Sequence, residues 1–162
     1  MIALEIIDYL SQYDETIKDL LVEIQEYIVQ IDREKYNKLT DEYREKYFEE
    51  TMKEVSKYEG KIFLAKENGE IIGLIIGIIY NNEVDAYDFA APKRGFVKDL
   101  VVSKNYRSKG IGKQLLNKME SYFKEVGCKG VLLNVFAYNE NAIQLYIKNG
   151  YFNRCIEMMK EI

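Results

Sequence analysis

The chain has 162 residues, of which 48% are hydrophobic and 31% are charged, and its formal net charge is −4. This length and composition are typical of one globular domain with a single core, which we place at residues 1–162. The acidic balance argues against a nucleic-acid-binding protein, because such proteins depend on positive charge. The absence of histidine excludes histidine general bases, serine–histidine–aspartate triads and histidine-ligated zinc.

The start of the chain, its apolar runs and its cysteines favour a cytoplasmic protein. The start of the chain lacks the charged and then apolar pattern of a secretory signal, and the longest apolar run, 71–80, is too short to span a bilayer. The two cysteines, Cys128 and Cys155, lie among apolar neighbours and have no metal-binding spacing. We therefore expect a soluble protein with neither a membrane partner nor a bound metal.

Two amphipathic helices are predicted in the first third of the chain. Apolar residues recur at steps of three and four across 17–31, after an N-cap candidate at Asp14. A second helix is predicted after Thr40, and its apolar side runs through 43–55. The opposite side of this helix is rich in Glu and Lys, which is typical of a solvated face.

The periodicity then changes to that of strands. Strands are predicted over 61–66 and 71–80, joined by a hairpin at Asn68 and Gly69, because both positions tolerate a positive φ. The second of these strands is apolar on both faces, so we expect it to be central. After a polar loop, a third strand is predicted over 95–102.

Helices and strands alternate in the last third. A helix is predicted over 110–126, a strand over 131–136, a short helix over 141–149 and a final strand over 151–162. The connection from the 95–102 strand to the next strand should be a parallel, right-handed crossover. The predicted fold class is α+β with three layers (α/β/α), in which a mixed, mostly antiparallel sheet of about six to seven strands carries helices on both faces.

The turn after the 95–102 strand has the features of an anion site. The next helix begins at Gly110 and Gly112, so its unpaired amides and the positive end of its dipole are open to a phosphate group. Arg107 and Lys109 add positive charge. The turn matches neither a P-loop nor a dinucleotide fingerprint, because glycines that each motif requires are missing. A tight turn without a ligand is the alternative interpretation.

Two segments resemble the GNAT superfamily of N-acetyltransferases. Arg107-x-x-Gly110-x-Gly112 matches the family's (Gln/Arg)-x-x-Gly-x-(Gly/Ala) signature and, as in the family, follows an apolar strand. The stretch 139–151 resembles the family's Asn-x-x-Ala-x-x-x-Tyr-x-x-x-Gly-(Phe/Tyr) segment, and the two motifs lie at the family's usual separation. The resemblance covers 95–162 and implies a GNAT-like fold and an acetyl-CoA-dependent N-acetyltransferase, with acetyl-CoA as cosubstrate and no metal.

The resemblance also implies roles for individual residues. The CoA pyrophosphate would be held by the main-chain amides of Arg107, Ser108, Lys109, Gly110, Ile111 and Gly112. The pantetheine arm would pair with the backbone of the preceding strand at Leu100, Val101 and Val102. Asn141 would hydrogen-bond the pantetheine, and the alternative is that it caps the helix. Tyr146 would protonate the leaving thiolate, and the alternative is ordinary core packing.

The implied reaction is direct transfer of the acetyl group to a primary amine. An aliphatic ammonium has a pKa of about 10.4 and must lose a proton before it attacks. Without histidine, a carboxylate acting through water is the natural base. Asp99 is the first candidate, because alternation places it with the apolar Val97 and Val101 on one strand face, and a structural carboxylate is the alternative. A strand amide at Leu100 or Val101 would polarise the thioester carbonyl. Weaker base candidates lie in the loop before this strand, at Glu83, Asp85 and Asp88.

The acceptor is a small-molecule amine or a peptide or protein amine, and a homodimer is left open. A cationic amine such as a polyamine, an aminoglycoside or a peptide N-terminus could be favoured by the acidic positions Glu49, Glu50, Glu54 and 83–88. Two other functions also fit the sequence. One is a non-catalytic acetyl-CoA-binding regulatory module, and the other is an acyltransferase that uses a longer acyl-CoA. Retention of both Asn141 and Tyr146 favours the enzyme over the regulatory module.

Overall fold

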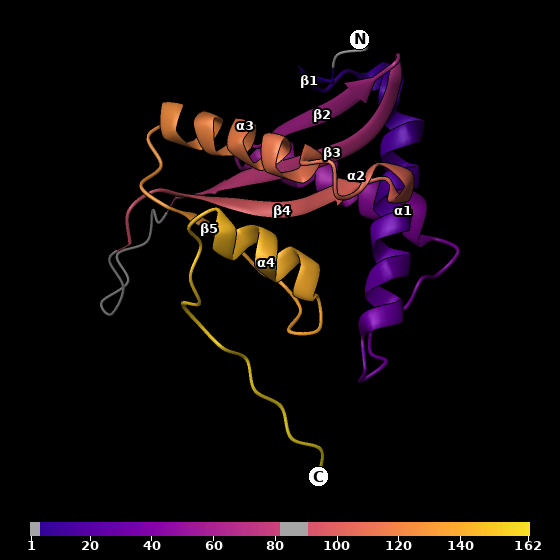
Figure 1. Ribbon diagram of the computed structural model, residues 1–162, viewed down its shortest axis with the longest axis vertical. Coiled ribbons are helices and arrows are strands. Elements are labelled where there is room, and N and C mark those ends of the chain that lie inside the picture. Colours follow the sequence, from indigo (N-terminus) through magenta and orange to yellow (C-terminus); the bar gives the residue numbers. More distant parts are fainter. Residues whose placement is uncertain (1–3, 82–90) are drawn as a thin grey trace.

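The computed structural model describes residues 4–81 and 91–162. Figure 1 shows the described helices and strands, which follow one another in the order β1 (Glu5–Asp8), α1 (Asp14–Ile31), α2 (Tyr43–Lys57), β2 (Lys61–Glu67), β3 (Glu70–Tyr80), β4 (Arg94–Val102), α3 (Ile111–Glu125), β5 (Val131–Leu133) and α4 (Glu140–Lys148). Two short 3-10 helices precede α1 and α3, at Ser11–Tyr13 and Lys104–Tyr106.

One mixed sheet forms the middle layer. Its strand order is β1-β2-β3-β4-β5, in which the first three pairings are antiparallel and β4 pairs with β5 in parallel. The helices α1 and α2 cover one face of the sheet, and α3 covers the other face (Figure 1). The predicted α+β class with helices on both faces is confirmed. The described residues form five strands rather than the expected six to seven.

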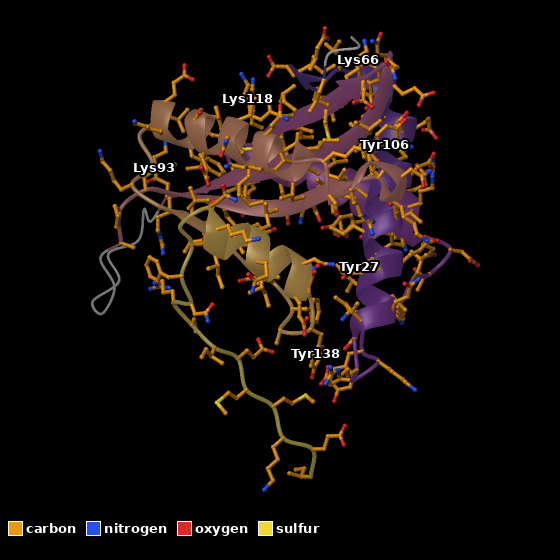
Figure 2. The ribbon with its side chains drawn as sticks, in the orientation of Figure 1. Tyr27, Lys66, Lys93, Tyr106, Lys118 and Tyr138 are labelled. Atoms are coloured by element: carbon orange, nitrogen blue, oxygen red, sulfur yellow. The ribbon has the colours of Figure 1, made fainter. Side chains whose placement is uncertain are left out.

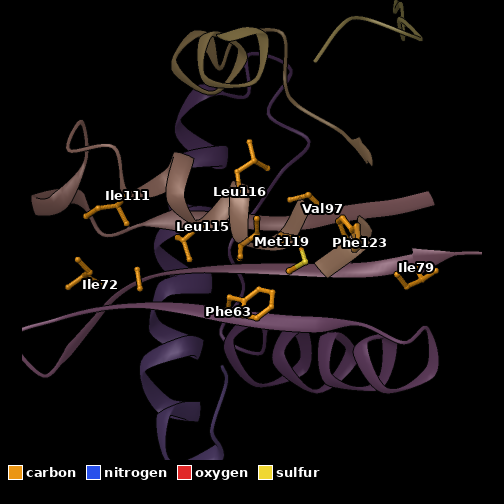
Figure 3. Close-up of a cluster of buried hydrophobic side chains, with 11 residues drawn as sticks. Phe63, Ile72, Ile79, Val97, Ile111, Leu115, Leu116, Met119 and Phe123 are labelled. Carbon is orange, nitrogen blue, oxygen red and sulfur yellow. The ribbon is translucent and has the colours of Figure 1, made fainter. Parts of the chain in front are cut away.

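Two hydrophobic cores hold the layers together. The core beneath α3 combines residues of β2, β3 and β4 with the buried stripe of the helix, which includes Leu115, Leu116, Met119 and Phe123 (Figure 3). The core beneath α1 and α2 joins helix residues such as Leu21 and Phe48 to the opposite face of the same strands. The strand β3 contributes to both cores, as expected for a central strand that is apolar on both faces.

The chain differs from its sequence-based prediction at the ends. A short strand at Glu5–Asp8 was not predicted, and the 131–136 strand is limited to Val131–Leu133. The final strand predicted over 151–162 is wrong, because these residues have no regular secondary structure. The hairpin between β2 and β3 is confirmed, since Asn68 and Gly69 both adopt a positive φ, of 54° and 85°.

Candidate functional site

The strand β4 separates from β5 partway along its length. The strand β5 pairs with β4 only at Gly95, Phe96 and Val97, whereas β3 pairs with β4 as far as Val102. From Lys98 onward, one edge of β4 therefore has no strand beside it in the part of the chain that the structure describes. Backbone groups on such an edge can pair with an extended ligand, as they would with an added strand.

Leu100 is the residue whose backbone faces this open edge. The amide of Ser103 donates to the Ile72 carbonyl on β3 at 2.8 Å, so the backbone groups of Val101, two residues earlier, also face β3. The groups of Leu100 and Val102 then face away from β3. The Val102 carbonyl accepts a hydrogen bond from Arg107 Nε at 2.9 Å, which agrees with this direction. Of the three strand residues predicted to pair with pantetheine, Leu100 is thus the best placed.

A β-bulge in β4 lies just before the open edge. Asp99 pairs with Ile76 and Val97 pairs with Gly77, so Lys98 is an extra residue without its own partner on β3. A bulge of this kind changes the direction of the side chains that follow it, because it adds one residue to a two-residue repeat.

The bulge turns two consecutive side chains toward α2. Lys98 Nζ forms an ion pair with Glu54 on α2 at 2.7 Å and lies 5.1 Å from the centre of the Tyr47 ring. The Asp99 carboxylate accepts a hydrogen bond from the Tyr47 hydroxyl. The prediction that Val97 shares a face with Asp99 is wrong, because Val97 packs in the core beneath α3.

Asp99 is a buried carboxylate that accepts a hydrogen bond from a side chain of α2. Its side chain lies in the interior, with the whole residue only 9% exposed, and the Tyr47 oxygen is 3.1 and 3.0 Å from its two oxygens. The Tyr47 ring is in turn stacked on Tyr43, with 4.9 Å between ring centres. Burial raises the pKa of Asp99 to about 6, although the Tyr47 hydrogen bond and the charge of Lys98 act in the opposite direction. Asp99 therefore changes protonation state close to neutral pH.

The negative charge of Asp99 affects the pKa of Tyr146. Tyr146 is on α4, partly buried against the core beneath α3, and its ring centre is 5.6 Å from that of Tyr151. Burial, with a smaller effect from the negative charge of Asp99, raises the pKa of Tyr146 to about 12. Tyr146 is therefore protonated at neutral pH and is able to donate a proton. Tyr146 packs against the core beneath α3 whereas Asp99 faces α2, so an electrostatic effect rather than a direct contact links the two predicted catalytic residues.

The loop between β4 and α3 has the backbone geometry of an anion site. Ser108 and Gly110 adopt positive φ values of 64° and 77°, and α3 begins directly afterwards at Ile111. The first amide paired within this helix is that of Gln114, which donates to the Gly110 carbonyl at 3.2 Å. The amides of Ile111 and Gly112 thus lie at the unpaired, positive end of α3. This arrangement fits an anionic group of a ligand.

The Arg107 side chain connects this loop to α1 through an ion pair. Its Nη2 lies 3.0 Å from Glu23 Oε1, and the same oxygen accepts a hydrogen bond from the Lys104 amide at 2.7 Å. The guanidinium also lies 5.6 Å from the centre of the Tyr27 ring. The Arg107 guanidinium is thus paired with a carboxylate of α1. Sequence reasoning missed Glu23, because the periodicity of α1 marks it only as a polar position on a helix.

The residues just before α4 contact α1 and the turn that follows α1. The Tyr27 hydroxyl lies 3.4 Å from Asn139 Oδ1, and the Tyr138 hydroxyl donates to Glu34 at 2.7 Å. Figure 2 labels the side chains of Tyr27 and Tyr138. Asn139 also caps α4, since its Oδ1 accepts a hydrogen bond from the Ala142 amide at 3.2 Å. The interpretation of Asn141 as the cap is therefore wrong, because Asn141 is the second residue of the helix.

Three further expectations concern the weaker base candidates, a metal site and a membrane-spanning helix. The weaker base candidates Glu83, Asp85 and Asp88 fall outside the described residues. Within 4–81 and 91–162, no group of three or more Cys, Asp or Glu side chains is arranged to hold a metal ion. No helix among these residues has both the length and the apolar character needed to cross a membrane.

Comparison with known proteins gives a consistent family assignment. The model of the acetyltransferase (GNAT) family matches residues 24–151. An N-alpha-acetyltransferase of Sulfurisphaera tokodaii is 34% identical over 117 residues, which cover 70% of this chain and 67% of that protein. Four other curated relatives are matched over only 42–45% of their own length.

Solved structures show the same fold. A proposed acetyl transferase of Pyrococcus furiosus is 30% identical, with a TM-score of 0.71 and coverage of 99% of this chain and 100% of that one. A protein of Bacillus halodurans is 18% identical, with a TM-score of 0.86 and coverage of 98% of this chain and 99% of that one.

Proposed function

Since the chain belongs to the acetyltransferase (GNAT) family, we propose that it transfers an acetyl group from acetyl-CoA directly to a primary amine. The observation that carries this proposal is the open edge of β4, which runs from Lys98 to Val102 and leads directly into the loop of positive-φ residues before α3. An aminoglycoside N-acetyltransferase with a similar fold (17% identical, TM-score 0.71) has been solved with CoA bound.

In the proposed complex, the extended CoA molecule lies along the open edge. The pyrophosphate binds the main-chain amides at the start of α3, from Arg107 to Gly112, because those groups point outward at the positive end of the helix. The pantetheine arm pairs with the backbone of β4, chiefly through Leu100, in the manner of an added strand. Asn141, on the first turn of α4, adds a side-chain contact to the pantetheine.

The acetyl group is transferred in one displacement. The neutral amine nitrogen attacks the thioester carbonyl carbon, and the resulting oxyanion is stabilised by a backbone amide of β4, for which Leu100 is best placed. A carbon–nitrogen bond forms and the carbon–sulfur bond breaks. The amine proton passes through water to the Asp99 carboxylate, and Tyr146 donates its proton to the departing CoA sulfur.

Asp99 suits the role of base for an acceptor of low basicity. Its pKa of about 6 is closer to that of a peptide α-amino group, about 7.7 to 8.0, than to that of a lysine side chain, about 10.4. The relative from Sulfurisphaera tokodaii is named an N-alpha-acetyltransferase, which also favours a peptide N-terminus. We therefore propose peptide α-amines as the first acceptor class to test, ahead of polyamines and aminoglycosides.

The proposal is tested by following thiol release from acetyl-CoA with a panel of peptides, polyamines and aminoglycosides. We expect turnover with at least one amine and CoA binding in a calorimetric titration. CoA binding without turnover on any amine would instead support the non-catalytic regulatory module. Faster turnover with a longer acyl-CoA would support the broader acyltransferase.

A further inference from the structure

One carboxylate of α1 holds both ends of the turn that follows β4. Glu23 Oε1 accepts a hydrogen bond from the Lys104 amide at 2.7 Å and another from Arg107 Nη2 at 3.0 Å. The two donors are 81 and 84 positions from Glu23 in the sequence, so the contact depends on how α1 packs beside the sheet. The Glu23 and Arg107 side chains are 29% and 40% exposed, and an ion pair that is partly withdrawn from water is screened less by salt.

The Arg107 guanidinium also binds the last residue of β4. Its Nε donates to the Val102 carbonyl at 2.9 Å, while Nη2 donates to Glu23. The guanidinium is planar, so donation through two of its nitrogens fixes both its position and its orientation. The turn 104–107 is therefore connected to the end of β4 through Arg107 and to α1 through Glu23.

The residues after this turn adopt a backbone that needs support from its surroundings. Ser108 directly follows Arg107 and has a φ of 64°, a value that is uncommon for residues other than glycine. Such a conformation persists where the neighbouring structure holds it in place. The unpaired amides of Ile111 and Gly112 follow shortly afterwards, so the attachment of the turn to Glu23 affects how these amides are presented to a ligand.

The charge of Glu23 is unfavourable for a phosphate ligand. The carboxylate and a diphosphate are both negative and repel each other, and the carboxylate also neutralises the charge of Arg107. A purely electrostatic effect of Glu23 therefore weakens the binding of an anion, whereas an effect through the position of the loop strengthens it. Because the two effects have opposite signs, a measurement of affinity separates them.

We propose that Glu23 is a positioning residue for acetyl-CoA, which holds the turn 104–107 so that the amides at the start of α3 receive the pyrophosphate. Arg107 serves as the connection between Glu23 and the end of β4. This role rests on the proposed function, because it requires that the loop binds the pyrophosphate of CoA. It adds a residue of α1, far from the glycine-containing turn in the sequence, to the residues that determine the affinity for the cosubstrate.

Calorimetric titration with CoA tests the sign of the effect. Glu23→Ala removes a negative charge and should nevertheless weaken CoA binding by about tenfold or more, because a hydrogen bond between charged partners is lost. Glu26→Ala is the matched control, since Glu26 is an exposed residue of the same helix whose side chain forms no hydrogen bond or ion pair with any described residue. We expect Glu26→Ala to bind CoA like the wild type. Unchanged or tighter binding by Glu23→Ala would overturn the proposal.

Two further changes test the connection through Arg107. Glu23→Gln keeps an oxygen that accepts from the Lys104 amide but loses the charge, so its affinity for CoA should lie between those of the wild type and Glu23→Ala. Arg107→Ala should also weaken binding. The double variant Glu23→Ala/Arg107→Ala should bind CoA more tightly than the product of the two single losses predicts, because both residues belong to one connection. Losses that multiply in full would show independent roles and overturn the proposal.

Steady-state kinetics separate this role from a general loss of structure. In Glu23→Ala the KM for acetyl-CoA should rise, while kcat at saturating acetyl-CoA stays close to that of the wild type, because Asp99 and Tyr146 are unchanged. A lower kcat with an unchanged KM would overturn the proposal. A wild type that binds no CoA would overturn the proposed function and this role with it. A wild type that binds CoA no more tightly than Glu23→Ala would overturn only the role of Glu23.

Discussion

The hydroxyl of Tyr47 on α2 lies 3.1 and 3.0 Å from the two carboxylate oxygens of Asp99 on β4, although the residues are 52 positions apart. The contact depends on the bulge at Lys98, which turns Asp99 toward α2 instead of into the core beneath α3. Tyr47 thus fixes the orientation of the proposed base. It also lowers the pKa of Asp99 relative to the value that burial alone would give.

Replacing Asp99 by Asn should reduce kcat/KM by about 10²–10⁴-fold, the usual contribution of a general base. The amide is similar in shape and can still accept a hydrogen bond from Tyr47, so the fold and CoA affinity should be retained. Steady-state kinetics and calorimetric titration with CoA measure the two effects separately. An Asp99→Asn variant with undiminished turnover would show that Asp99 is a structural carboxylate.

The pH dependence of kcat/KM should reveal the ionisation of Asp99. A general base acts in its deprotonated form, so the rate should rise with pH through about 6 in the wild type. The Tyr47→Phe change removes a hydrogen bond that stabilises the carboxylate, so the pKa of Asp99 should rise and the acid limb should move to higher pH. Tyr43→Phe is the matched control, because Tyr43 stacks on Tyr47 but donates no hydrogen bond to Asp99. Equal profiles for Tyr47→Phe and the wild type would argue against this coupling.

Tyr146→Phe should lower kcat and leave CoA affinity nearly unchanged. The phenyl ring preserves the packing, whereas the proton donor to the CoA sulfur is lost. We expect a slower but measurable rate, because a thiolate is a good leaving group. Tyr151→Phe provides the comparison, since its ring lies 5.6 Å from that of Tyr146 and its hydroxyl bonds to Glu120 instead. If the two variants were equally active, Tyr146 would have no specific role.

Gly110→Glu should abolish CoA binding, because it places a carboxylate where the pyrophosphate is expected. Gly110 has a φ of 77°, so part of the effect of any substitution is backbone strain. Gly127→Glu supplies the same strain at the other end of α3, where φ is 88° and the added side chain also enters open space. Thermal unfolding should show similar destabilisation of both variants, while calorimetry should show lost CoA binding only for Gly110→Glu. Loss of binding in both would attribute the effect to strain.

Gly95→Ala should destabilise the fold by about 1–3 kcal/mol, the usual cost of an extra methyl group in a packed core. The added Cβ would overlap the ring of Phe123, a residue of α3 that is buried in the core. Gly130→Ala is the control, because the nearest atom to its Cβ would be 3.9 Å away. Urea unfolding of the two variants measures the difference in the free energy of unfolding, and equal values would contradict this packing.

Local patterns predicted most of the fold. The hairpin at Asn68 and Gly69 and the start of α3 after Gly110 were predicted because each depends on backbone preferences within a few residues. The face of Val97 was predicted incorrectly, since one extra residue in β4 reverses the alternation and no local signal marks the bulge.

The candidate site was predictable only in part. Its loop and Tyr146 follow from sequence motifs, and Asp99 was found as a polar residue among apolar neighbours. Its partner Tyr47 was placed only on the apolar side of a helix, because a contact across 52 positions is set by tertiary packing. The pattern of 151–162 indicated a strand, whereas these residues have no regular secondary structure.

The most direct test of the proposed activity is mass spectrometry of a peptide with a free α-amino group after incubation with the protein and acetyl-CoA. We expect one acetyl group on the α-nitrogen and one free CoA thiol for each acetylated peptide, with the Asp99→Asn variant much slower. Failure to acetylate any amine in the panel by a folded protein that binds acetyl-CoA would contradict it.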